Sequence, residues 1–432
     1  MRGKELDESA AIAYKQALKA IARKASALAL FAFLSFSTAS ANLQSAGQGL
    51  GQAQKPASEV HAHQRLKGIF VGMNSLEAYE NDPNLGRAIS KISSTGFNVV
   101  EVEAVGAYGS AFYRSGIVPM KQSYFKHFAD GDDPLKDVIR EASKRNLKVW
   151  AWVHPFTGNH ILYNEHPGWF AVDSYGSKSH RYLDFMNPHV RAYTFSMLKE
   201  LASNYKISGI NLDIELPRDM VSYSKKDLSM FAEDNNLRGV TAASVSDGRY
   251  SAMWDAWTEK MLYDFLAKCY SSLKKGDPGL VISYDVVPNP FYWYYYNDWL
   301  QILKRKSADV IEPMLYWRDY GYPESMIKGI TEYDISLMKS MKSKSRIMAI
   351  IGGNMRTTYD VSGREWVRAL SEAGKGGSKD VAVFAYECIK RRGAWSGIKK
   401  YLIKEKKRDK QTLLAADSVH AGDKCTLECN PP

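Results

Sequence analysis

The fold is constrained most by a regular alternation of short β-rich runs with amphipathic helical stretches. The β-rich runs are 66–73, 97–104, 147–155, 207–216, 280–287, 309–317, 346–353 and 381–389. The clearest helical stretches are 84–96, 134–146, 188–205, 254–275 and 362–377. Strands that alternate with helix-length segments form parallel β/α units, and eight such units predict an α/β fold of the (β/α)8 TIM-barrel type. A doubly wound sheet is the alternative, but no glycine-rich phosphate loop follows the first run.

The fourth run, "SGINLDIELP" at 208–217, carries polar side chains at every second position. Alternate residues of a strand share a face, so Asn211, Asp213 and Glu215 are expected to point the same way. The intervening isoleucines and leucines would then pack on the opposite face. Two carboxyl groups this close repel each other and their pKa values separate, which suits an acid/base pair.

Other polar and aromatic side chains occur at or just after the ends of the predicted strands. They are Glu101, Glu103, His154, Asp285, Tyr316, Trp317, Asp319, Asn354 and Glu387. Active sites of these barrels lie at the C-terminal ends of the strands, so the sequence predicts one site built from this set. We expect one of Glu101 and Glu103 to reach the cleft and the other to pair with a base inside the barrel. We expect one of Tyr316 and Trp317 to face the cleft.

Three long βα loops are predicted at the same end of the barrel, after strands 3, 4 and 5. They comprise 156–187, 217–251 and 288–299. The last contains six consecutive aromatic residues, of which Tyr292 and Trp293 are our candidates for ligand contact, because six neighbours cannot all face inward. Long loops at the functional face predict a built-up cleft rather than a small pocket.

The net charge of +11 is confined to two segments. Residues 1–24 carry +3 and residues 390–410 carry +8, so the body of the chain is close to neutral and no nucleic-acid groove is predicted. The basic 390–410 segment is either a solvated helix face and tail or a contact with an anionic polymer or lipid surface.

The N-terminus has the pattern of an export signal. Arg23 and Lys24 precede an apolar run that is too short to span a bilayer and ends in Ala39-Ser40-Ala41. We expect residues 1–41 to be a signal peptide or an N-terminal anchor, 42–64 a flexible linker, 65–405 the barrel and 406–432 a basic tail. The tail holds Cys425 and Cys429, whose spacing matches no zinc site, and we expect no metal or organic cofactor.

The 166–217 block resembles the glycosyl-hydrolase-like 10 family of exported bacterial barrel proteins. The resemblance rests on the "HPGW" loop, the "NPHVR" helix start and the "GINLD" strand. "EPMLYWRDY" at 312–320 and "VFAYECI" at 383–389 are also similar to the family's strands 6 and 8, so the resemblance covers roughly residues 66–400.

Strand 4 is also similar to the chitinase family-18 signature, but Ser208 and Asn211 stand where that family has acids, and its strand-3 motif is missing. The resemblance implies that Glu215 protonates the glycosidic oxygen, that Asp213 orients the reacting group and that Tyr316 supports the intermediate. From the residues alone, Glu215 could equally be a structural carboxylate. Asp213 remains an orienter, a nucleophile or an ion-pair partner of Arg218 or Arg318.

These patterns together predict an exported glycoside hydrolase that acts on a polysaccharide, and the resemblance implies an amino-sugar glycan such as peptidoglycan or chitin-like strands. The expected substrate contacts are Glu103, His154, Asn211, Asp285, Tyr292, Trp293, Trp317, Asp319 and Glu387. Asp285 and Glu387 are also candidates for a second catalytic carboxyl group. A non-catalytic carbohydrate-binding barrel is the alternative, because the departures at Ser208 and Asn211 leave it open. A polysaccharide deacetylase fits less well, since its metal-binding His/Asp set is missing.

Overall fold

The computed structural model describes residues 64–73, 82–121, 123, 131–214, 216, 221–288, 298–353 and 361–405. All of them belong to one unit, Ser58–Pro432. Glu215, Tyr292, Trp293 and Asn354 lie outside the described residues, as do the predicted signal segment and the cysteine-containing tail. Among the helices described, none is long and apolar enough to cross a membrane.

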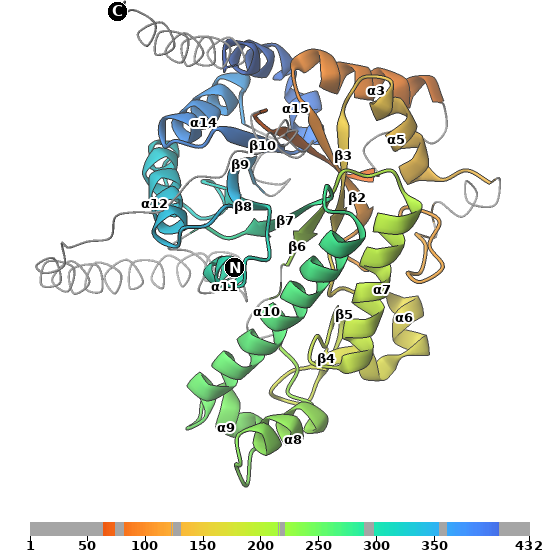
Figure 1. Ribbon diagram of the computed structural model, residues 1–432, viewed down its shortest axis with the longest axis vertical. Helices are drawn as coiled ribbons and strands as arrows, with labels where there is room; N and C mark the ends of the chain where they lie inside the picture. Colours follow the sequence, from red (N-terminus) through yellow and green to blue (C-terminus); the bar gives the residue numbers. More distant parts are fainter. Residues whose placement is uncertain are drawn as a thin grey trace, which may run out of the picture. The chain divides into compact units, whose positions relative to one another are not determined.

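Eight parallel strands close into a barrel, which confirms the predicted (β/α)8 fold (Figure 1). They are β1 (Lys67–Val71), β2 (Val99–Val105), β3 (Lys148–Val153), β6 (Gly209–Asp213), β7 (Val281–Val286), β8 (Val310–Leu315), β9 (Arg346–Gly352) and β10 (Asp380–Phe384). Each barrel strand pairs with the next one along the chain, and β10 pairs with β1, where Val381 lies opposite Lys67. Closure leaves no unpaired strand edge in the barrel.

Helices follow the strands around the outside of the barrel (Figure 1). They are α3 (Asp82–Thr95), α5 (Pro134–Ser143), α7 (Pro188–Asn204), α10 (Ser251–Gly276), α11 (Trp299–Lys304), α12 (Ile327–Ser340), which follows the 3₁₀ turn η6 (Glu324–Met326), α14 (Gly363–Lys375) and α15 (Tyr386–Arg392). Local sequence sets where several of them begin. Asn187 caps the start of α7, because its side chain accepts a hydrogen bond from His189 N, and Pro188 occupies the first helical position. Ser362 and Glu365 form a capping box at the start of α14.

The last predicted strand was too long. The run 381–389 is extended only to Phe384, and Tyr386 begins α15, which ends at a left-handed Gly393 with φ of 59°. A short apolar run does not by itself distinguish a buried strand from the buried face of a helix, so the pattern overran the strand end.

The loops after β3 and β6 contain structure of their own. The first holds α6 (His160–Glu165), the 3₁₀ turn η3 (Pro167–Trp169) and a two-stranded antiparallel sheet of β4 (Phe170–Val172) and β5 (Lys178–Leu183). The second holds α8 (Lys225–Asp234) and α9 (Ala242–Ser246). The two insertions meet where Tyr223 N donates to Val172 O at 2.6 Å, and Figure 1 shows them together at the far end of α10.

The strand side chains divide into two apolar groups according to the two-residue period. Ile69, Val100, Ile210 and Leu212 pack outward against the helices, whereas Phe70, Trp150, Trp152, Met314, Met348 and Ile350 form a separate cluster inside the barrel. Gly209 permits a close contact inside the barrel: a Cβ there would lie 2.6 Å from Cδ1 of Trp150. The glycine of the "SGIN" motif is therefore required for packing of the tryptophan.

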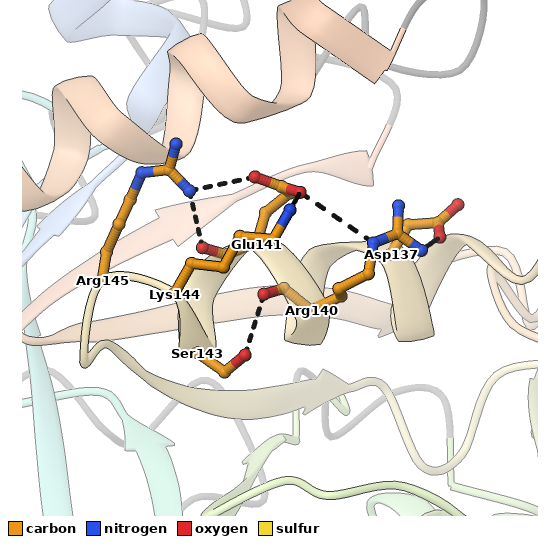
Figure 2. Close-up of polar contacts among 6 residues, drawn as sticks. All are labelled: Asp137, Arg140, Glu141, Ser143, Lys144 and Arg145. Atoms are coloured by element: carbon orange, nitrogen blue, oxygen red, sulfur yellow. Dashed lines mark hydrogen bonds and ion pairs between the residues drawn. The ribbon is translucent and has the colours of Figure 1, made fainter.

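A cluster of charged side chains on α5 and just after its C-terminal end surrounds the buried Glu141 (Figure 2). Lys144 Nζ lies 2.5 Å from Oε1 of Glu141, and Arg145 Nη1 lies 2.9 Å from Oε2. The hydrogen bond from Lys144, together with Arg145, holds the pKa of Glu141 below its ordinary value although burial opposes this. A Cβ at Gly86 of α3 would lie 3.3 Å from Oε2, so the cluster contacts the neighbouring helix.

Replacing Glu141 by Gln is expected to lower the free energy of unfolding by about 0.5–1 kcal/mol at pH 7. A carboxyl whose pKa is lowered by folding stabilises the fold above its unfolded pKa of about 4.3, and the effect is lost as pH falls through the folded value. Thermal unfolding should therefore give E141Q a lower melting temperature than wild type at pH 7, and the two melting temperatures should converge below pH 4. Glu332→Gln removes a surface pair with Lys328 on α12 and serves as the control. A gap between E141Q and wild type that persists at acid pH contradicts this assignment.

Candidate active site

Asp213 lies at the C-terminal end of β6 and is 5% exposed. Trp152 Nε1 donates a hydrogen bond to its Oδ2 at 3.2 Å, and His154 Nδ1 lies 3.7 Å from the same oxygen. Oδ1 has no hydrogen-bond partner among the described residues. The carboxyl group opens on a pocket whose lining includes His154, Thr157, Arg181, Tyr182 and Leu216. One oxygen is thus held by Trp152, and the other is buried without a hydrogen-bond partner among the described residues.

Burial raises the pKa of Asp213 to about 7. The hydrogen bond from Trp152 and the positive charge of Arg181 both oppose the rise. Arg318, one of the ion-pair partners considered above, instead bonds Glu365 at 2.8 Å, and Arg218 lies outside the described residues. A carboxyl group poised near neutral pH can give or take a proton at little cost, which is the property of a general acid or base.

Glu103, at the C-terminal part of β2, is a second carboxyl group of the same kind. Burial and the negative charge of Glu387 raise its pKa to about 7, against the Met73 backbone N–H at 3.3 Å and the positive charge of Lys121. Trp152 lies between the two acids in the strand register, paired with Glu103 on one side and with Asn211 of β6 on the other. The two perturbed carboxyl groups therefore belong to neighbouring parts of one barrel mouth.

Aromatic rings line the mouth around Trp152. Its ring centroid lies 5.4 Å from that of Phe70, 5.6 Å from Phe384 and 5.2 Å from His154. Phe384 in turn lies 5.7 Å from Tyr316, whose ring is stacked on Tyr320 at 6.4 Å. The Tyr316 side chain is half-buried.

Below the mouth, Asn211 connects a polar network inside the barrel. Its Nδ2 lies 2.7 Å from Asp285 Oδ1, 3.1 Å from Ser283 Oγ and 3.2 Å from Glu312 Oε1. Burial raises the pKa of Glu312 to about 8, and burial together with the charges of Glu312 and Asp285 raises that of Glu101 well above its ordinary value. The two glutamates interact electrostatically, and burial favours the protonated form of each. We expected a basic side chain to pair with the glutamate inside the barrel. No such ion pair with Glu101 is found among the described residues.

The structure brings some of the predicted site residues together and separates others. Asp213, Glu103, His154, Tyr316 and Glu387 lie at the barrel mouth, whereas Asn211 and Asp285 belong to the interior network. Trp317 lies elsewhere: it is 5% exposed and packs edge-to-face on Trp366 of α14. Asp319 is exposed, and its backbone N–H donates a hydrogen bond to Tyr316 O at 3.1 Å. Of the adjacent aromatic pair, Tyr316 is the one that packs against Phe384 at the end of the barrel interior.

Trp152 and Arg181 lie at the site but were not predicted from the sequence. Trp152 alternates with His154 in "VWAWVHP", so the two-residue period could have identified it. Arg181 lies on β5, a strand that interrupts a long loop and carries no clear apolar alternation, so nothing in the pattern placed it near Asp213. Within the described part of the chain, no three His, Cys, Asp or Glu side chains are grouped to hold a metal ion.

The family model described as glycosyl hydrolase-like 10 matches residues 65–353, and the chain belongs to this family. A curated relative, glycosyl hydrolase YngK of Bacillus subtilis (strain 168), is 27% identical over 140 residues. That match covers 29% of this chain and 26% of the relative, so it spans only about a quarter of that protein.

Solved structures of glycoside hydrolases share the fold. The PgaB (BpsB) glycoside hydrolase domain from Bordetella bronchiseptica superposes with a TM-score of 0.62 at 14% identity, covering 78% of this chain and 99% of that one. A β-galactosidase from Marinomonas ef1 gives a TM-score of 0.56 at 12% identity, over 82% and 60% of the two chains. At these identities the likeness shows the fold alone.

Replacing Glu312 by Gln is expected to stabilise the protein at alkaline pH. A carboxyl whose pKa rises from about 4.3 unfolded to about 8 folded destabilises the fold progressively between those values, and fully above the higher one. Gln imitates the protonated form. The melting temperature of E312Q should match wild type at pH 4, below both pKa values, and exceed it at pH 9, with Glu332→Gln unchanged relative to wild type at both. An equal difference at both pH values would show that Glu312 is already ionised when folded.

Proposed function

We propose that the protein is an exported glycoside hydrolase that cleaves an amino-sugar glycan, such as the glycan strands of peptidoglycan or chitin-like strands. One observation carries this proposal: the Asp213 carboxyl is buried beside a pocket at the barrel mouth, its pKa is about 7, and one of its oxygens has no hydrogen-bond partner among the described residues. Membership in the glycosyl hydrolase-like 10 family supports the reaction class.

The proposed chemistry assigns different roles to neighbouring carboxyl groups. Glu215 acts as the general acid that protonates the glycosidic oxygen, and Asp213, as the carboxylate, orients or attacks at the anomeric carbon. Tyr316 supports the intermediate from β8. A glycosidase needs two carboxyl groups about 5–5.5 Å apart for retention through a protein nucleophile, or about 6.5–9.5 Å apart for inversion. Glu103 is our candidate for a further acid at this site.

The aromatic mouth suits a sugar ring. Pyranose rings present C–H faces that pack on aromatic side chains, and Tyr316 with the neighbouring Tyr320 offers such a surface beside Phe384. His154 and Glu387 would supply hydrogen bonds at the edge of the same ring.

Export and retention on an anionic surface are part of the proposal. The basic n-region and the apolar run before Ala39-Ser40-Ala41 support export. Exposed cations on and after α15 begin the basic 390–410 segment, which would hold the enzyme near an anionic wall or membrane. They are Lys390, Arg391, Arg392, Lys399 and Lys400.

Replacing Asp213 by Asn, or Glu215 by Gln, is expected to reduce kcat by about 10²–10⁴-fold, the range that general acid–base groups contribute. The full chain and both variants are incubated with purified peptidoglycan glycan strands and with chitin oligomers, and released fragments are followed by mass spectrometry. Glu332→Gln is the matched control for loss of a surface carboxylate and should retain full activity.

Two results would contradict this assignment in different ways. Full activity in D213N removes Asp213 from the mechanism. If wild type binds the glycan without any cleavage, the alternative of a non-catalytic carbohydrate-binding barrel is favoured. The uncharged Asn211, at a position where chitinases have an acid, also supports that alternative.

The pH dependence of kcat/KM is expected to show an acid limb near pH 7, because Asp213 must be ionised to act. Trp152→Phe keeps an aromatic ring but removes the hydrogen bond that lowers the pKa of Asp213. The acid limb should therefore move to higher pH in W152F, whereas Trp366→Phe, a change in the outer core, should leave it in place. A limb that stays near pH 7 in W152F would assign it to another group.

A further inference from the structure

A second pocket lies beside the Asp213 pocket, between the loop that follows β2 and the β5 side of the insertion after β3. It holds about 860 Å³, including space open to solvent. Its described lining includes Tyr108, Lys121, Gly158, Asn159, His160 and His180. We call it the Tyr108 pocket.

Tyr108 presents an unusually exposed and well-supported aromatic ring. Its side chain is 68% exposed, and the guanidinium carbon of Arg181 lies 5.2 Å from the ring centroid. Arg181 is itself held in place, because its Nε donates to Ala107 O at 3.0 Å and its guanidinium also packs 5.0 Å from Tyr182. A ring with a fixed cation beside it and much of its surface in solvent is a preformed platform for a sugar face.

The Tyr108 pocket and the Asp213 pocket share a wall. Thr157 and Arg181 line the Asp213 pocket, and their chain neighbours Gly158 and His180 line the Tyr108 pocket. The two segments are joined by a hydrogen bond from Gly158 N to Arg181 O at 2.7 Å. A linear glycan that crosses this wall would contact the lining of both pockets.

The charge of the two pockets differs. The site at the barrel mouth is rich in carboxyl groups, whereas the described lining of the Tyr108 pocket contains Lys121, two histidines and no aspartate or glutamate. Lys121 also acts electrostatically on Glu103 at the barrel mouth, where its positive charge lowers the pKa of that carboxyl. A free amino sugar would be repelled at Lys121, and a sugar with a carboxylate would be attracted.

We propose that the Tyr108 pocket is a second saccharide subsite that binds a sugar unit carrying a carboxylate, as the muramic acid units of peptidoglycan do. Tyr108 packs against the sugar face and Lys121 pairs with the carboxylate. This inference rests on the proposed function, and it selects peptidoglycan over chitin-like strands as the glycan.

The test measures binding to the full chain carrying Asp213→Asn, so that cleavage does not interfere. Three tetrasaccharides are compared by calorimetry: alternating N-acetylglucosamine and N-acetylmuramic acid, the same compound with its carboxylates converted to amides, and chitotetraose. We expect the acidic compound to bind about tenfold more tightly than the other two. Lys121→Gln should remove this preference, and Tyr108→Ala should weaken all three by about tenfold, which corresponds to about 1.4 kcal/mol.

Tyr175→Ala provides the matched control. Tyr175 is 94% exposed in the turn between β4 and β5 and does not line the pocket, so its loss should leave all three affinities unchanged. Because Tyr108 and Lys121 are surface residues, thermal unfolding should show each variant folded. Equal binding of the acidic and amidated compounds, unchanged binding in Y108A, or no binding at all overturns the proposal.

The outcome is separable from that of the proposed function. If wild type cleaves the glycan but its affinity does not depend on Tyr108 and Lys121, the subsite proposal is wrong and the hydrolase proposal stands. If the affinity depends on both residues but wild type does not cleave the glycan, the subsite proposal stands and the hydrolase proposal is wrong.

Discussion

The burial of carboxyl groups within the barrel is the constraint on which the site depends. A barrel of eight strands must fill its interior with side chains, and here Trp150 and Trp152 share that space with Glu101, Asp285 and Glu312. Ionised carboxylates are costly there, so the interior glutamates keep protons at neutral pH. Asp213 sits one step nearer the mouth, where Trp152 and Arg181 offset part of that cost and leave its pKa at about 7.

The same arrangement explains how loops and barrel cooperate. The barrel supplies the acid groups at the strand ends, and the β4–β5 insertion supplies Arg181. The positive charge of Arg181 lowers the pKa of Asp213, and its guanidinium packs on the ring of Tyr108. A single guanidinium thus connects the electrostatics of the reacting group with the shape of the neighbouring pocket. This is consistent with a division in which strands carry chemistry and loops carry specificity.

Much of the fold could be predicted from the sequence, because strand alternation and helix caps are local properties. The two-residue period in "SGINLDIELP" correctly separated Asn211 and Asp213 from the outward-facing Ile210 and Leu212. The side chains that surround Asn211 and Asp213 could not be predicted in the same way. That Asn211 would bond Asp285 of β7, or that Arg181 would approach Asp213, depends on strand register and on a hairpin within a long loop, neither of which has a local signal. Trp317 and Tyr316 were indistinguishable by type and are separated only by the face on which each lies.

The most direct test of the account is the pKa of the Asp213 carboxyl itself. Carbon-13 NMR of the full chain with labelled aspartate, titrated from pH 3 to 9, follows every aspartate carboxyl, and the signal missing from D213N assigns Asp213. The account predicts a midpoint near pH 7, about three units above that of an ordinary aspartate. A midpoint near pH 4 would mean that the buried carboxyl is ionised throughout and would contradict the proposed site.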